Sequence, residues 1–200
     1  MARPAQVEKR NDLADAAVDV LRREGLELSM AGLADALGVK RPTLLYHFPT
    51  KAHIVERALE ALLVEQAAFV LARVEAQRHP IDRLYAQLCA VHEFHRGREE
   101  RIVFLSQAIA ATSAGRVPEI IAVGNRVFEA HRLAAAELLR RGIEEGSVVP
   151  CDPDAVIAVV RALVDGLLVQ RVMNGIELGP VHEFVWDHLL GPLKVETEES

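Results

Sequence analysis

The segment from Ser29 to Lys51, which reads SMAGLADALGVKRPTLLYHFPTK, constrains the fold of this chain more than any other stretch. Two short helices that cross steeply need a small residue at the crossing and a glycine in the turn between them. Ala34 and Gly38 stand at these two positions. Four apolar side chains would hold both helices on a supporting helix: Leu33, Leu37, Val39 and Leu44. The spacing therefore predicts a helix-turn-helix.

The second helix of such a unit lies in the major groove of DNA, so its outward side chains decide which bases are read. Most of the outward side chains expected here can form hydrogen bonds, and Thr43 adds a methyl group that can meet a thymine methyl. They belong to Lys40, Arg41, Thr43, Tyr46 and His47. We therefore expect this segment to bind double-stranded DNA.

The same segment resembles the signature of the TetR family of bacterial repressors. The resemblance covers roughly the first quarter of the chain and is carried by Ala34, Gly38-Val39, Pro42-Thr43-Leu44, Tyr46-His47-Phe48 and Lys51. It implies that Thr43 and Tyr46 face the groove. It also implies that His47 contacts the backbone or a base edge, and that Lys51 meets a phosphate. One departure is Leu45, where many members have an aromatic residue; Leu45 can make an apolar contact instead.

The expected DNA-binding residues are therefore Ser29, Lys40, Arg41, Pro42, Thr43, Tyr46, His47 and Lys51. The net charge of -6 does not contradict this expectation, because residues 1–50 hold seven basic and seven acidic side chains. The acidic excess thus lies entirely after residue 50. DNA binding needs a local basic footprint, and the chain as a whole can be acidic.

Apolar residues recur at helical spacing along the whole chain, which predicts an all-α fold of about nine helices. Before residue 50, helices are expected from about Val7 to Glu24, from the N-cap Ser29 through Leu37, and from Arg41 to Phe48. A long helix should begin at Lys51. Later helices are expected over Ile81–Arg96, Glu99–Ala111, Val117–Glu145, Asp152–Met173 and from Gly179-Pro180 through Leu190.

We expect two domains, a helix-turn-helix DNA-binding domain at residues 1–50 and a ligand-binding and dimerisation domain at residues 51–200. The resemblance implies this second role. The helix from Ala155 to Val172 is apolar over more than one stripe, so a partner should cover the excess. The residues expected at a homodimer interface are Val156, Val160, Leu163, Leu167, Phe184 and Trp186.

A pocket for a small-molecule effector should lie among the middle helices, where polar residues interrupt apolar stripes. The candidates are Tyr85, Cys89, His92, His95, Gln107 and His131. Three of them follow at steps of three and also admit a metal-sensing alternative. We favour the interpretation without a metal, because no carboxylate cluster accompanies them. No cofactor is expected, and the composition of the helices favours an apolar or amphipathic effector.

We expect a ligand-responsive repressor that binds a palindromic operator as a dimer. Two other function classes compete with this interpretation. A helical adaptor without DNA binding is the main alternative. An enzyme is less favoured, because the sequence has no nucleophile elbow, no Gly-rich phosphate loop and no acid pair at useful spacing. The N-terminus lacks the apolar core of a signal peptide, and Arg161 and Asp165 interrupt the most apolar helix. We therefore expect a cytoplasmic protein without a membrane span.

Overall fold

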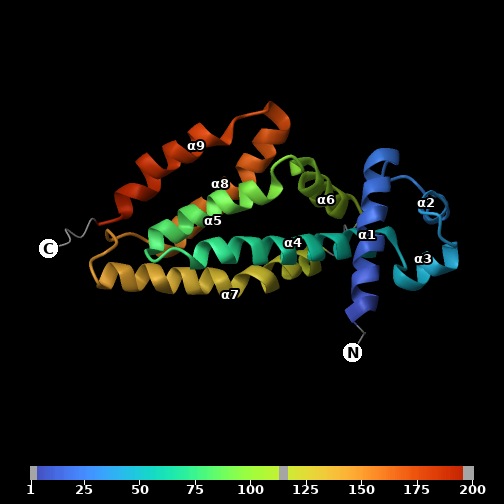
Figure 1. The fold of residues 1–200 in the computed structure, drawn as a ribbon, viewed down its shortest axis with the longest axis horizontal. Coiled ribbons are helices and arrows are strands. Elements are labelled where there is room, and N and C mark those ends of the chain that lie inside the picture. Colours follow the sequence, from blue (N-terminus) through green and yellow to red (C-terminus); the bar gives the residue numbers. More distant parts are fainter. Residues whose placement is uncertain (1–3, 113–116, 196–200) are drawn as a thin grey trace. The chain divides into compact units, whose positions relative to one another are not determined.

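The structure is a computed structural model that describes residues 4–112 and 117–195, and in these ranges the chain is helical (Figure 1). The helices are α1 Pro4–Glu24, α2 Met30–Ala36, α3 Arg41–His47, α4 Lys51–Glu75, α5 Pro80–His95, α6 Glu99–Thr112, α7 Val117–Glu144, α8 Pro153–Asn174 and α9 Leu178–Val185. The described residues contain one isolated β-bridge, between Val148 and Lys194, and no longer strand. The predicted all-α fold of about nine helices is confirmed.

The chain folds into two compact units. Unit 1 comprises Met1–Val64 and Arg101–Asn125, and unit 2 comprises Glu65–Glu100 and Arg126–Ser200. Helices α4, α6 and α7 each contribute residues to both units. The expected boundary between residues 50 and 51 divides the chain by function, whereas the two compact units divide it by packing. The functional boundary therefore remains a prediction. None of the helices in the described ranges is long and apolar enough to cross a membrane.

The core of unit 1 brings the first four helices together through small and aliphatic side chains. Its fully buried members include Ala14, Ala17, Val18, Leu21, Leu33, Ala34, Leu44, Phe48, Ile54, Val55 and Ala58. Residues from α1, α2, α3 and α4 are all present in this set. The two short helices α2 and α3, of seven residues each, are therefore held by packing, because helices of that length are marginal in isolation.

Unit 2 is built on α5 and α8, which lie against each other, with α7 and α9 completing the unit. Its core includes Ile81, Leu84, Leu88, Leu139, Val160, Leu168, Leu178 and Val185. Local signals set both ends of α8. The Asp152 carboxylate accepts hydrogen bonds from the backbone N–H groups of Asp154 and Ala155, and Gly175 ends the helix with a φ of 65°.

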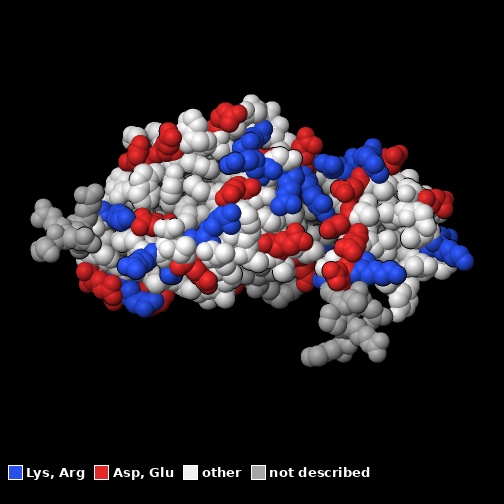
Figure 2. Space-filling view, viewed as in Figure 1, with Lys and Arg blue, Asp and Glu red and all other residues white. Residues whose placement is uncertain are grey.

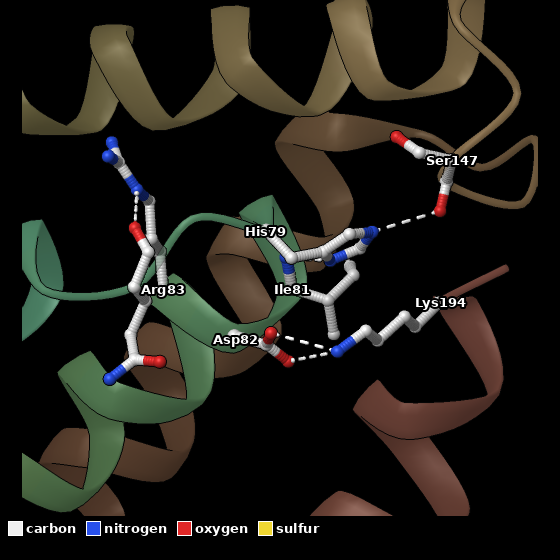
Figure 3. A network of polar contacts seen from close by, with 7 residues as sticks. His79, Ile81, Asp82, Arg83, Ser147 and Lys194 are labelled. Carbon is white, nitrogen blue, oxygen red and sulfur yellow. Dashed lines mark hydrogen bonds and ion pairs between the residues drawn. The ribbon is translucent and has the colours of Figure 1, made fainter. Parts of the chain in front are cut away.

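One end of unit 2 ties the C-terminal segment to the start of α5 (Figure 3). His79 caps α5, because its Nδ1 accepts from the backbone N–H of Ile81 at 3.2 Å. With Nδ1 accepting, its Nε2 donates to the carbonyl of Ser147, at 3.0 Å. The Lys194 ammonium reaches both carboxylate oxygens of Asp82, at 2.8 and 3.0 Å. These contacts join three segments that are distant in sequence.

The last helix differs from its prediction. A single helix was expected through Leu190, but α9 ends at Val185 and is followed by a π turn, Trp186–Leu190, and a 3-10 turn, Gly191–Leu193. The backbone N–H of Gly191 donates to the carbonyl of Trp186, which closes the wider turn. A Cβ at residue 191 would lie 2.7 Å from that carbonyl oxygen. Only glycine fits this turn without moving the backbone.

Replacing Gly191 with alanine is expected to destabilise unit 2 by about 1–3 kcal/mol, because the added methyl collides with backbone that cannot rotate away. Thermal unfolding followed by circular dichroism measures the change. Gly179→Ala is the matched control, since a Cβ there meets nothing within 4 Å. Equal melting temperatures for the two variants would contradict this account of the π turn.

Candidate nucleic-acid interface

The turn between α2 and α3 has the geometry that the sequence predicted. The Ser29 hydroxyl accepts from the backbone N–H of Gly32 at 3.1 Å and so caps α2. Gly38 adopts a φ of 65°, which favours glycine, and the N–H of Val39 donates to the carbonyl of Ala34 at 3.0 Å. Pro42 lies in the first turn of α3, where it costs no hydrogen bond. The turn therefore sets the direction in which α3 leaves α2.

Helix α3 has one buried face and one open face. Leu44 and the adjoining Phe48 are completely buried, whereas the side chain of Tyr46 is 82% exposed. The other exposed residues at this helix are Lys40, Arg41, Pro42 and Thr43. His47 is half-buried and its ring meets the ring of Tyr46 edge to face, with centroids 5.1 Å apart. The residues that hold α3 in the core and the residues that it exposes to solvent thus belong to the same two turns.

Charge is concentrated locally at this helix. Figure 2 shows Lys and Arg side chains over α3, with acidic side chains nearby on unit 1. Arg10 also belongs to this region, since its guanidinium lies over the ring of Phe48 at 5.3 Å. The sequence singled out α3 but gave no sign of this contact, because the two residues are far apart along the chain.

Lys51 lies at the first position of α4, where the resemblance places it. Its side chain is part-buried, and its ammonium donates to the carbonyl of Leu26, between α1 and α2. A second bond from α4 connects Arg57 Nε to the Asn11 side chain on α1, at 2.7 Å. In this arrangement Lys51 positions the helix-turn-helix on α4, and its contact with a phosphate remains a prediction.

The six ligand candidates do not converge on one site. Tyr85 and Cys89 are half-buried and line one pocket of unit 2. His95 is buried and bonds to Gln66 at 2.8 Å, while Gln107 and His131 are exposed. In the described residues no three metal-ligating side chains gather, and Cys89, His92 and His95 have separate partners. Tyr85 and Cys89 therefore share a pocket.

The buried His92 pairs with the half-buried His182, a contact that the sequence did not predict. Its Nδ1 lies 2.8 Å from Nε2 of His182, and its Nε2 lies 3.0 Å from the carbonyl of Val164. Because that carbonyl can only accept, His92 donates from Nε2, and its Nδ1 accepts from His182. Burial lowers the pKa of both rings, that of His182 to about 4. The neutral pair thus connects α5 to both α8 and α9.

The six residues expected at a dimer interface differ in how far they are exposed. Phe184 is 57% exposed, and Val156, Leu163 and Leu167 are half-buried. Val160 is buried in the core of its own unit, so the expectation for this residue needs correction. Trp186 packs against Tyr85, with ring centroids 4.9 Å apart. The apolar side chains that α8 and α9 do expose are Val159, Val169, Val172, Met173 and Phe184, with Leu189 in the π turn.

Comparison with known proteins agrees with the geometry of the N-terminal segment. Residues 13–58 match the family described as bacterial regulatory proteins, tetR family. Over 189 residues the chain is 25% identical to the nucleoid occlusion factor SlmA of Aliivibrio fischeri, covering 92% of this chain and 94% of that protein. The family match over residues 13–58 includes α2, α3 and the start of α4.

Solved structures share the fold along almost the whole chain. The regulator FadR from Bacillus subtilis, solved in complex with stearoyl-CoA, aligns with a TM-score of 0.70 at 18% identity over 89% of this chain and 96% of that one. The ketosteroid regulator KstR2 of Mycobacterium tuberculosis aligns with a TM-score of 0.64 at 22% identity over 94% and 96%. At such identities the likeness shows the fold alone. The match to the tetR family is thus one of residues 13–58, and the match to solved structures is one of fold along nearly the whole chain.

The pair of His92 and the half-buried His182 makes the stability of the chain depend on pH. The unfolded chain takes up protons at His182 near pH 6.5, whereas the folded chain does so only near pH 4. Stability is therefore complete above about pH 7 and falls as the pH is lowered through 6.5 toward 4. We expect the melting temperature to fall by roughly 5 °C across this window.

The variant His182→Gln tests the origin of this dependence, because its amide can still donate to His92 but does not titrate. Its melting temperature should change less between pH 7 and pH 4 than that of the wild type. His188→Gln replaces an exposed histidine of the same region and should retain the full dependence. The assignment to His182 fails if both variants keep the wild-type pH profile.

Proposed function

Because the chain is a DNA-binding transcriptional regulator of the tetR family, we propose that it acts as a repressor. As a homodimer it binds a palindromic operator, and a small apolar or amphipathic effector releases it. DNA binding places this activity in the cytoplasm. The observation that carries the proposal is the division of α3 into a buried face, Leu44 and Phe48, and an open face that displays Tyr46.

The open face of α3 combines two kinds of contact. Lys40 and Arg41 lie at the N-terminal end of the helix and bring positive charge for phosphates or base edges. Thr43 and Tyr46 stand one turn apart on the same face, where they would reach the base edges. Ser29, at the N-cap of α2, offers a further phosphate contact beside them. Pro42 and His47 complete the contact surface.

The exposed apolar side chains of α8 and α9 support a homodimer. Val159, Val169 and Met173 follow α8 at helical spacing and are 51%, 39% and 73% exposed. Gly166 lies between them, and a Cβ there would meet nothing, so another helix can approach closely. Phe184 extends the surface onto α9. We call these residues the α8–α9 face. A two-fold axis through it would give two copies of α3, which suits a palindrome.

Release by an effector needs a helix that belongs to both units, and α4 meets this need. At its start, Lys51 bonds to Leu26 and Arg57 bonds to Asn11. Near its end, Phe69 packs on Phe94, with centroids 5.4 Å apart, and Arg73 pairs with Glu93 at 3.1 Å. An effector that shifts α5 would thereby move α4 and with it the support of α3. The effector must prefer one of the two states to act in this way.

Removing the two charges at the start of α3 tests DNA binding. The double variant Lys40→Ala/Arg41→Ala should bind duplex DNA more weakly, and log affinity should depend less steeply on log salt, by about one unit for each lost phosphate contact. Fluorescence anisotropy of a labelled duplex at several salt concentrations measures both quantities. Both side chains are exposed, so the melting temperature should not change.

A matched control is Arg78→Ala/Arg140→Ala, which removes the same charge from exposed positions of unit 2. This control should keep the wild-type salt dependence. If both double variants weaken binding equally, total charge and not α3 governs the interaction, and the proposed interface is wrong.

The variant Phe184→Asp tests the homodimer. A carboxylate at this 57% exposed position would have to be buried without a partner when two α8–α9 faces meet. Sedimentation velocity at micromolar concentration should therefore show a monomer with unchanged helix content. Leu133→Asp on α7, where the leucine is 60% exposed, is the control and should leave the dimer intact. A wild-type chain that sediments as a monomer would refute the dimer.

A further inference from the structure

A pocket of about 400 Å³ lies between α5 and the turn after α9 in unit 2. This volume suits a small organic molecule. Two aromatic rings form one wall: Tyr85 from α5 and Trp186 from the π turn, 4.9 Å between centroids and tilted by 49°. Cys89 lies one turn beyond Tyr85 and bonds to it. The wall thus offers apolar area and the negative faces of two aromatic rings.

The charged groups around this pocket are carboxylates. Asp82, Glu183 and Asp187 belong to its lining, and the lining has no basic side chain. Within the part of the chain that the structure describes, Glu183 and Asp187 pair with no lysine or arginine. Figure 2 shows acidic side chains over α9, with Lys and Arg side chains nearby. The pocket therefore has a negative potential at its mouth.

The environment of the pocket changes the pKa of the Tyr85 hydroxyl. Burial, followed by Cys89, Glu183 and Asp187, raises its pKa to about 12, because each of these disfavours a negative phenolate. The same field that opposes an anion at this position stabilises a cation.

The protein places one of its own cations at the edge of this site. Lys194 Nζ lies 2.8 Å from Asp82 and 6.0 Å from the centre of the Trp186 ring (Figure 3 shows the ion pair). An ammonium is thus held between a carboxylate and an aromatic ring. Lys194 uses the Asp82 carboxylate and leaves those of Glu183 and Asp187 for a ligand.

We propose that this pocket binds an organic cation, a molecule with an ammonium group on a small apolar body. The apolar body would lie against Tyr85 and Trp186, and the cationic group would face Glu183 and Asp187. Ring faces attract cations within about 6 Å, and the effect grows as water is excluded. An anion of the same size would meet two uncompensated carboxylates.

The proposed site is compatible with the α8–α9 face. Glu183 on α9 and Asp187 in the π turn line the pocket, and each is followed by a residue, Phe184 and His188 respectively, that points about a quarter-turn further around. A second copy seated on Phe184 therefore leaves the acidic side of α9 accessible. Binding of the cation is independent of the proposed function; only an effect of the cation on DNA binding would rest on it.

Trp186 is the single tryptophan of the chain, so intrinsic fluorescence reports directly on the pocket. The probe is benzyltrimethylammonium, titrated into the full chain without DNA. Its neutral isostere, neopentylbenzene, and the anion benzenesulfonate are the comparison ligands. We expect a saturable change with the cation, about ten-fold weaker binding of the isostere, and no binding of the anion. Added salt should weaken the cation only.

The variant Glu183→Gln/Asp187→Asn should weaken binding of the cation about ten-fold and leave that of the isostere unchanged. Both side chains are exposed, so the fold should persist, which circular dichroism verifies. Glu144→Gln/Glu145→Gln removes two exposed carboxylates elsewhere in unit 2 and should bind as the wild type does.

Equal affinity of the wild type for the cation and its isostere would overturn the proposal without reference to any variant. So would a double variant that binds the cation as tightly as the control does. Because DNA is absent from this titration, a chain that failed to repress would still give the expected binding. Conversely, a chain that did not bind the cation would leave the proposal of DNA binding by α3 unaffected.

Discussion

The complete burial of Leu44 and Phe48 is the constraint on which the DNA-binding surface depends. Helix α3 has seven residues, too few to persist without tertiary contacts. These two side chains fix it in unit 1, and Gly38 sets its direction by adopting a left-handed φ. With Leu44 and Phe48 committed to the core, α3 presents Arg41, Pro42, Thr43 and Tyr46 outward. The burial of Leu44 and Phe48 therefore determines which side chains of α3 face outward.

Local signals in the sequence predicted the parts of this architecture that depend on neighbouring residues. Ser29 caps α2 as expected, and Asp152 and Gly175 cap the two ends of α8, because capping involves atoms within one turn. Nothing local indicates that Lys51 reaches the Leu26 carbonyl, or that His92 pairs with His182, ninety residues away. The π turn at Trp186 escaped prediction for the same reason. Its ring packs on Tyr85, a distant residue, so no local signal marks this contact, and a place for Trp186 at a dimer interface remains a prediction.

The two units meet different physical demands in the proposed function. Unit 1 needs a rigid surface of mixed charge, and its core of small side chains provides that rigidity. Unit 2 needs surfaces that a partner or a ligand can change. It keeps exposed apolar side chains on α8 and α9 and an acidic, aromatic pocket beside them. Helix α4 belongs to both units, so a change in one has a covalent route to the other.

The central claim, that α3 reads a specific operator as half of a dimer, is tested most directly by selecting bound duplexes from a random DNA pool. The account predicts enrichment of an inverted repeat for the wild type, with affinity that falls steeply with salt. It also predicts loss of that enrichment for Tyr46→Ala, since this exposed ring has no structural role in unit 1. No enrichment with the wild type, or the same repeat with Tyr46→Ala, would contradict it.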